Sequence, residues 1–217
     1  FTQYEIFNKW FNLKDNLKQK VDDKRSFHSA LWESFNFEPV NDQFYSELVT
    51  HFKILNSHLE KSFDKLDAAS FTTRLLGRLL FVWFLKKKGL INESFNYFNG
   101  GDPKDQTQYY KKYLENLFFE VLNKEKKLRG HDDKSTPYLN GGLFDRVSDI
   151  FKDNSNLTFP NSYFIDIYKT LKKYNFTTDE GSTEFQFVAV DPEMLGRIFE
   201  SLLEKQIDIL SNKSVKA

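Results

Sequence analysis

The sequence predicts an all-α domain, and three observations support this fold class. Gly and Pro are scarce, with 9 Gly and 5 Pro among 217 residues, so few positions break a helix. Apolar residues recur at steps of three and four over most of the chain, which is the period of an amphipathic helix. The segment from Leu75 to Leu85 is apolar nearly all round, as a buried central helix should be. We therefore expect a bundle of about seven helices packed around this segment.

Residues 1–40 predict two helices. Thr2 and Glu5 have the spacing of a capping box, and apolar residues at helical steps continue the pattern to residue 20. A shorter helix fits residues 26–35, and Pro39 should end it. Asn41 then has the residue type of an N-cap for the next helix.

Two long helices should follow. Between residues 42 and 66 the apolar stripe lasts about seven turns, which gives a rod of roughly 40 Å. The next helix, residues 70–88, ends with three lysines and Gly89, because cations favour a helix C-terminus and Gly adopts the left-handed conformation that stops a helix. Arg78 interrupts the apolar run, which falls short of the about 18 residues that cross a bilayer. We therefore expect no membrane span, and the N-terminus has no signal-peptide pattern.

The second half of the chain predicts helices separated by longer loops. A loop over residues 89–107 leads to a helix at 109–127, and a further helix follows Pro160 and reaches residue 174. Residues 177–190 are then a loop with room for one short β-hairpin. The last helix starts with an N-cap residue, a proline at the first helical position and an acid in the first turn. These residues are Asp191, Pro192 and Glu193.

Composition excludes several classes of protein. Lys plus Arg is 31 and Asp plus Glu is 31, so the zero formal net charge lacks the overall signature of a general nucleic-acid or anionic-membrane binder. Without cysteine there is no disulfide framework, thiolate metal site or thiol nucleophile, and a cytoplasmic location is the easier fit. The chain does not begin with Met, and we expect it to be a piece of a longer protein.

Motifs for metal or nucleotide chemistry are weak. No His pair has the i,i+4 spacing of a zinc-protease helix, and His51 and His58 are two turns apart, which favours two separate side chains over a ligand pair. The Gly pairs lack the lysine of a phosphate-binding loop. A self-contained hydrolase using His131, Asp132 and Asp133 is the least favoured hypothesis.

Basic residues of the predicted central helix are the best local candidates for contacts with DNA phosphates. They are Arg74, Arg78, Lys86, Lys87 and Lys88, with a second cluster at Lys124, Lys126, Lys127 and Arg129. A soluble helix also carries such residues without binding DNA, so the ordinary surface interpretation stays open. Arg78 lies within an apolar run, and a buried guanidinium requires a carboxylate or carbonyl partner.

Three stretches in this order carry a resemblance to a known family. The first runs over residues 71–90, the second is Tyr-Leu-Asn-Gly-Gly-Leu-Phe at 138–144, and the third is Asp-Pro-Glu-Met-Leu-Gly-Arg-Ile-Phe-Glu at 191–200. Together they resemble the helical region that precedes the methyltransferase domain of single-chain type IIG restriction-modification enzymes and related adenine-N6 DNA methyltransferases. The resemblance covers about residues 36–205.

The resemblance implies partners and cofactors for a parent protein. In that family an endonuclease domain cuts DNA with Mg²⁺, and a methyltransferase domain transfers a methyl group from S-adenosylmethionine to adenine. This chain has neither the Asn-Pro-Pro-Tyr tetrapeptide nor the Gly-rich methyl-donor loop. We therefore expect no catalytic residue, metal site or cofactor site in the chain itself. Whether an endonuclease domain precedes Phe1 is left open.

The matched motifs supply further candidates for contact with DNA or with a neighbouring domain. Gly196 within a helix costs about 1 kcal/mol relative to Ala, so it suggests a close approach by another backbone or ligand, although a harmless small residue is an equal alternative. The Gly pair at 141–142 can be a structural turn or a contact loop. The candidates are Asn140, Gly141, Gly142, Asp191, Pro192, Glu193, Gly196 and Arg197.

Two functional hypotheses of different classes follow. The first is a helical connector at residues 41–205, preceded by N-terminal helices at 1–40 and followed at 206–217 by a linker to a methyltransferase domain. It would position its own methyltransferase and nuclease domains and assist binding to double-stranded DNA. The second is a helical protein-interaction module without a nucleic-acid role, which the neutral charge and the many Tyr and Phe residues would suit.

Overall fold

The computed structural model describes residues 38–139, 142–145, 156–174, 176, 196 and 200. These ranges are all helix, turn and loop, with no strand among them, so the all-α prediction is confirmed. They contain four α-helices together with shorter helical turns, and about seven helices are not shown. The helices expected at 2–20 and 26–35 and the hairpin expected at 177–190 lie outside the described ranges.

The first described helix is α3 (Glu38–Leu59), and its ends differ from the prediction. It starts at Glu38, before Asn41, so Pro39 belongs to its first turn, where the missing amide hydrogen bond costs nothing. It ends at Leu59, not at residue 66, because a turn over residues 60–62 separates it from the next helix. The apolar stripe of α3 is fully buried at Phe44, Leu48, Phe52, Leu55 and Leu59.

Helix α4 (Lys65–Lys87) is the predicted central helix, and it starts five residues earlier than expected. Its N-cap is Asp64, whose carboxylate accepts a hydrogen bond from the amide of Leu66 at 2.8 Å. At the other end Gly89 has a φ of +68°, and the amides of Gly89 and Leu90 bond to the carbonyls of Lys86 and Leu85. This pair of bonds is the Schellman motif, so the predicted glycine stop is confirmed.

The sequence argument against a membrane span in α4 was wrong on length. The helix has 23 residues, and by length and apolar composition it could cross a bilayer, the one such helix among the described residues. However, 78% of its most apolar window is buried inside the folded chain. A core helix of a soluble protein passes the same test, so this feature is weak evidence for a membrane role.

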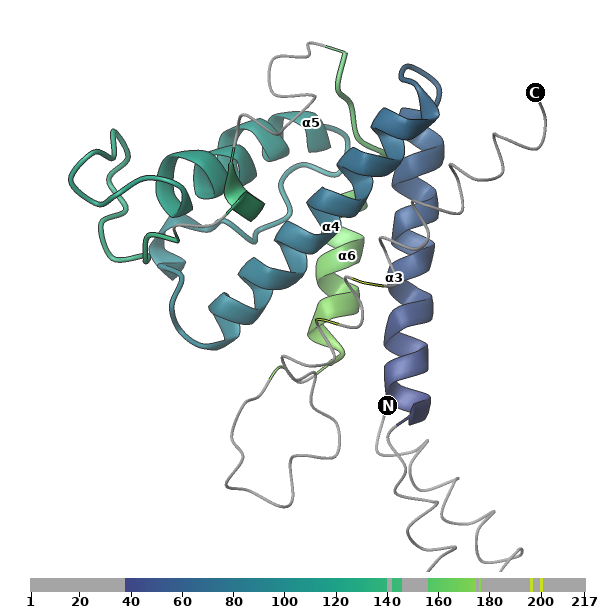
Figure 1. The fold of residues 1–217 in the computed structure, drawn as a ribbon, viewed down its shortest axis with the longest axis horizontal. Helices are drawn as coiled ribbons and strands as arrows, with labels where there is room; N and C mark the ends of the chain where they lie inside the picture. Colours follow the sequence, from purple (N-terminus) through teal and green to yellow (C-terminus); the bar gives the residue numbers. More distant parts are fainter. Residues whose placement is uncertain are drawn as a thin grey trace, which may run out of the picture.

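A second helical layer lies on the other side of α4 (Figure 1). It begins as α5 (Gln106–Tyr109) and continues as the π-helical turns η2 (Tyr110–Leu114) and η3 (Asn116–Leu122). The helix expected at 109–127 is therefore present with shifted ends. Phe71 of α4 meets Tyr110 edge to face at 6.1 Å between ring centres, which places the two layers in contact.

Helix α6 (Tyr163–Lys172) packs on both α3 and α4 and completes the core. Trp83 of α4 stacks on Tyr168 of α6, with ring centres 5.6 Å apart and planes 13° apart. Between α6 and α3, the hydroxyl of Thr170 lies 2.9 Å from Nε2 of His51. Phe44 of α3 also packs against Tyr174, which follows α6, with ring centres 4.5 Å apart, so α3 and α6 are in contact near this end as well. Figure 1 shows α4 crossing in front of α6, with α3 beside them.

Candidate functional site

Arg78 joins α4 to a distant segment of the chain. Its side chain is 1% exposed, Nε donates a hydrogen bond to the carbonyl of Leu143 at 2.7 Å, and Nη2 donates to the carbonyl of Asp145 at 3.4 Å. The guanidinium carbon also lies 4.9 Å from the ring centre of Phe119. The expectation that a buried Arg78 needs an oxygen partner is confirmed. A DNA phosphate could reach this guanidinium only if the covering residues moved away.

The segment that Arg78 holds is part of the second resembling stretch. Residues Gly142–Phe144 form a 3₁₀ turn, η4, and Phe144 is 1% exposed against Phe118 and Phe81. The motif is therefore packed on the core at its C-terminal half. Gly142 is exposed and a side chain there would meet open space, which leaves it accessible to a partner. Asn140 and Gly141 lie outside the described residues.

The predicted lysines at the end of α4 form a basic end of the molecule. Lys86 makes an ion pair with Glu93 and lies 5.6 Å from the ring centre of Phe98. The ammonium nitrogens of Lys87 and Lys88 lie 5.7 Å from the ring centres of Trp83 and Phe84, respectively, and neither makes an ion pair among the described residues. The charge of Lys87 nevertheless helps to lower the pKa of Glu93. In these contacts the ammonium groups face the aromatic rings, and no carboxylate at ion-pair distance among the described residues competes with an incoming anion.

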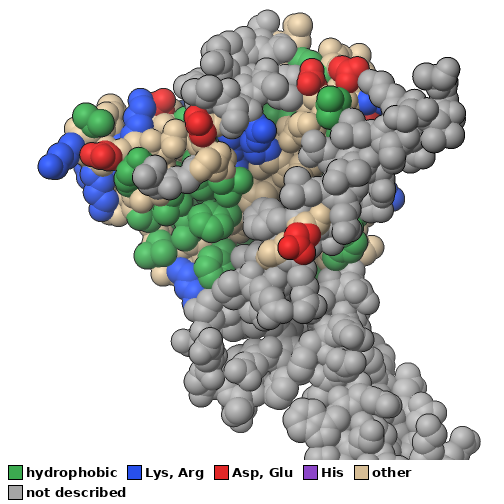
Figure 2. Space-filling view, in the orientation of Figure 1, with side chains coloured by type: hydrophobic (Ala, Val, Ile, Leu, Met, Phe, Trp, Pro, Cys, Tyr) green, Lys and Arg blue, Asp and Glu red, His purple; other side chains and the backbone are tan. Residues whose placement is uncertain are grey.

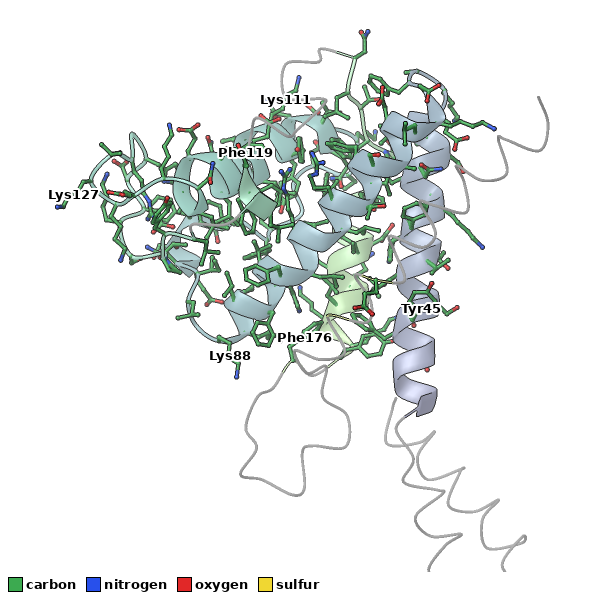
Figure 3. The ribbon with its side chains drawn as sticks, in the orientation of Figure 1. Tyr45, Lys88, Lys111, Phe119, Lys127 and Phe176 are labelled. Carbon is green, nitrogen blue, oxygen red and sulfur yellow. The ribbon has the colours of Figure 1, made fainter. Side chains whose placement is uncertain are left out.

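Helix α6 adds lysines at the same end of the molecule, which the sequence could not show. Figure 3 shows Lys88 after α4 and Phe176 after α6 at the same lower edge. Lys173 pairs with Glu47 of α3 at 3.0 Å, and Lys169 pairs with Asp166 at 3.1 Å. Lys172 is exposed and has no ion-pair partner among the described residues.

An apolar surface lies next to this basic end. Figure 2 shows hydrophobic side chains gathered over the C-terminal half of α4, with basic side chains at the lower border of the patch. Phe81 and Phe84 of the C-terminal half of α4 and Leu143 of η4 are half-buried and pack against the core, and we call these three side chains the apolar patch. An apolar face next to lysines is typical of a docking surface for another protein or domain.

The loop that carries His131, Asp132 and Asp133 is held together internally. Asp133 is fully buried and accepts hydrogen bonds from the hydroxyls of Thr136 at 2.6 Å and Tyr97 at 3.0 Å, and from the amides of Thr136 and Ser135. Burial alone would raise the pKa of Asp133, but these hydrogen bonds lower it below its usual value. Its carboxylate is therefore committed to the loop.

This arrangement does not support a hydrolase at the same residues. Nδ1 of His131 accepts a hydrogen bond from the amide of Asp133, so it holds the loop and does not face a substrate. Among the described residues no three His, Cys, Asp or Glu side chains gather closely enough to bind a metal ion. Arg129 of the second basic cluster is also buried in this loop, at 5% exposure.

The two histidines of α3 lie apart, as expected. His51 bonds to Thr170, and Nε2 of His58 lies 3.0 Å from the hydroxyl of Thr158. Burial lowers the pKa of His51, and nearby Asp166 and Glu47 raise it by less. Each histidine is hydrogen-bonded to a threonine, His51 to Thr170 of α6 and His58 to Thr158 of the loop before α6.

The remaining predicted contact residues stay predictions. Arg74 is half-buried in α4. Gly196 is exposed, and a side chain there would meet no atom within 4 Å, so the close approach suggested for it is not made by the described residues. Four further candidates lie outside the described residues: Asp191, Pro192, Glu193 and Arg197.

A cavity of about 270 Å³ lies between the C-terminal ends of α4 and α6 and the turn η1 (Glu93–Phe95). Trp83 and Phe98 contribute aromatic surface, and Lys86, Lys172 and Glu93 contribute charge. The sequence analysis missed this feature, because its lining comes from segments more than 70 positions apart. The only sequence signal was a run of asparagines around η1, which resembles an ordinary polar loop.

Comparison with known proteins agrees with the resemblance at a coarse level. A Methanocaldococcus jannaschii protein named "putative type II restriction enzyme and methyltransferase" is 34% identical to this chain over 164 residues. The match includes 70% of this chain and 13% of that protein, so the chain spans about an eighth of its relative. No family model and no solved structure matches. The chain is therefore related to a type II restriction-modification protein.

Proposed function

We propose, from this relationship, that the chain is the helical connector of a type II restriction-modification protein whose parent methylates adenine at N6 in DNA. The observation that carries the proposal is the 34% identity to about an eighth of a much longer relative named for both activities. A segment that small can serve a two-activity protein without containing either active site. The S-adenosylmethionine and Mg²⁺ would then bind to other domains of the parent.

Two surfaces support the connector role. The apolar patch of Phe81, Phe84 and Leu143 would pack against the neighbouring methyltransferase or nuclease domain, where burial of apolar side chains stabilises a fixed arrangement. The basic end at Lys87 and Lys88 would add contacts to phosphates of double-stranded DNA. The rigid α3–α4–α6 core would hold the two surfaces in a constant relation.

The parent reading frame is the first test of this proposal. An Asn-Pro-Pro-Tyr tetrapeptide and a Gly-rich loop after a predicted strand, within about 200 residues after Ala217, would agree with an adenine-N6 methyltransferase domain. A reading frame that encodes neither motif on either side of the chain would contradict the proposal.

DNA binding by the chain tests the second surface. Fluorescence anisotropy with duplex DNA should show affinity that falls steeply with salt, and Lys87→Ala/Lys88→Ala should reduce the slope of log K against log salt by up to about 1.8. The matched control is Lys104→Ala/Lys111→Ala, which removes the same charge from exposed positions of the loop before α5 and of η2. Equal slopes for the two double variants would show that the basic end does not contact DNA.

The second candidate function is a protein-interaction module without a nucleic-acid role, and the apolar patch favours it. The same measurement separates the two candidates. A module of this kind would show no salt-dependent DNA binding, whereas an apolar interface with a protein partner would persist at high salt.

A further inference from the structure

The cavity at the shared end of α4 and α6 has the size of a small ligand site. Its volume of about 270 Å³ lies just below the 300–1,000 Å³ of ordinary drug-sized ligand pockets. One base with its phosphate is therefore a better match than a dinucleotide. Phe81, Phe84 and Leu143 of the apolar patch do not line it, so the cavity is separate from the docking surface.

One side of the cavity is a fixed aromatic corner. Trp83 stands edge to face with Phe98, with ring centres 5.7 Å apart and planes 88° apart, and its other face stacks on Tyr168. Phe98 is half-buried, so part of its ring faces the cavity. Because Trp83 is buried and holds Phe98 in place, a planar base could pack on the exposed part of the Phe98 ring without first ordering that side chain.

The cavity also carries two ammonium groups from different helices, and that of Lys86 lies 5.6 Å from the ring centre of Phe98. Lys172 lines the cavity from the last turn of α6 and has no ion-pair partner among the described residues. Lys86 lines it from the last turn of α4, where Glu93 is its partner. The hydrogen bond from Lys86 lowers the pKa of Glu93, so this exposed carboxylate is ionised and competes with any other anion for Lys86. The carbonyl ends of α4 and α6 disfavour an anion, so the lysine side chains would have to hold it.

Asn96 supplies an unused hydrogen-bonding group at the rim of the cavity. Asn92 and Asn99 each use their side-chain oxygen to accept a backbone amide, from Ser94 at 3.0 Å and from Gly101 at 2.9 Å. Asn96 is exposed, ends η1 in the left-handed conformation with a φ of 52°, and its carboxamide has no hydrogen-bond partner among the described residues. A carboxamide offers a donor and an acceptor, which suits the edge of a base.

We infer that this cavity binds a nucleotide, with the base against Phe98 and the phosphate between Lys86 and Lys172. Asn96 bonds the edge of the base. This inference goes beyond the connector role, which requires no ligand in the cavity. The nucleotide can be free in solution or a unit of a DNA strand, since both present the same base and phosphate.

Calorimetry on the full chain tests the inference with dAMP, deoxyadenosine and inorganic phosphate as separate probes. Saturable binding of dAMP that is tighter than either fragment is expected, because only dAMP uses both the aromatic ring and the lysines of the cavity. Lys172→Ala should weaken dAMP binding about tenfold, as loss of a charge-assisted contact. Glu93→Gln should tighten it about two- to fivefold by releasing Lys86.

Matched variants control for the general loss of charge. Lys169→Ala removes a lysine one turn earlier on α6 that pairs with Asp166 and does not line the cavity, so dAMP binding should not change. Glu120→Gln breaks the comparable pair with Lys124 outside the cavity and should also have no effect. The inference is overturned if dAMP does not bind, if phosphate binds as tightly as dAMP, or if Lys172→Ala equals Lys169→Ala.

The source of the nucleotide is decided by a second set of probes. A 5′-phosphorylated single-stranded oligonucleotide that competes with dAMP would show that a DNA strand can enter the cavity, whereas dAMP binding without competition would assign a free nucleotide. Failure of this inference leaves the salt-dependent duplex contact of Lys87 and Lys88 unaffected. Failure of the connector role likewise leaves dAMP binding unaffected, so the two outcomes are distinguishable.

Discussion

Two buried arginines, Arg78 and Arg129, make similar hydrogen bonds in different regions of the molecule. They are 1% and 5% exposed, and both donate to backbone carbonyls. Arg129 bonds to the carbonyls of Lys124, Asp133 and Thr136, at most seven positions away along the chain. Arg78 bonds to carbonyls 65 and 67 positions away.

The difference in sequence separation predicts a difference in what each arginine stabilises. Removal of Arg129 should open a loop that its own residues close, and the helices can stay packed. Removal of Arg78 should separate η4 from α4 and leave carbonyls of the core without partners. The comparison teaches that burial of the same side chain can support either a local loop or the tertiary fold.

The largest expected effect is that of Arg78→Ala. We expect a loss of about 3–5 kcal/mol in the free energy of unfolding, because buried carbonyls lose a charged donor and a cavity forms beside Phe119. Urea denaturation followed by circular dichroism measures it. Arg78→Met, which keeps the apolar stem but not the donors, should lose less. A loss below about 1 kcal/mol for Arg78→Ala would show that Arg78 does not stabilise the tertiary fold more than Arg129 stabilises its loop.

A second long-range contact, between Gly100 in the loop before α5 and Ile165 of α6, gives another test of how contacts distant in sequence stabilise the fold. Gly100 has a φ of +81°, and an added Cβ would lie 2.7 Å from Cγ1 of Ile165 in α6. Gly100→Ala should therefore cost about 2–4 kcal/mol, from left-handed strain and overpacking together. Gly89→Ala is the matched control, since Gly89 has a φ of +68° but no neighbour within 4 Å. It should cost only about 1 kcal/mol. Equal melting temperatures for the two variants would show that the contact with α6 is easily relieved.

The local side of the comparison is tested by Arg129→Ala. We expect a loss of about 1–2 kcal/mol, smaller than for Arg78 because Nη2 of Arg129 has no hydrogen-bond partner in the described part of the chain and its other bonds are local. Hydrogen exchange should show faster exchange in residues 124–136 and unchanged protection in α4. Loss of protection throughout α4 would mean that this loop supports the whole fold.

The smallest expected effect is a pH dependence at His51, whose bond to Thr170 joins residues 119 positions apart. Burial lowers the pKa of His51 below 6.5, so the unfolded chain binds a proton more readily than the folded chain. Stability is therefore complete above about pH 6.5 and falls as the pH drops below it, by about 1 kcal/mol or less. His51→Gln should show a smaller slope between pH 6.5 and 5. The carboxylates with lowered pKa are Asp133, Glu47 and Glu93, and their protonation changes stability only below this pH window.

The candidate site was only partly predictable. The sequence identified Lys86, Lys87 and Lys88 as a cationic helix end, and it identified Arg78 as a buried cation. It did not identify Lys172, because helical spacing shows which residues share a face of α6 but not which other helix end lies beside it. The cavity could not be predicted for the same reason, since its lining residues Trp83, Asn96 and Lys172 come from three separate elements.

The sequence by itself determined the helical class, the apolar face of α3, the burial of α4 and its stop at Gly89. These features depend on local periodicity and on the conformation that one residue can adopt, so neighbouring residues suffice to predict them. Only the tertiary structure decided which carbonyls receive the guanidinium of Arg78 and which lysines share an end of the molecule. Those outcomes depend on contacts between segments 65 or more positions apart, and local pattern places no constraint on such pairs.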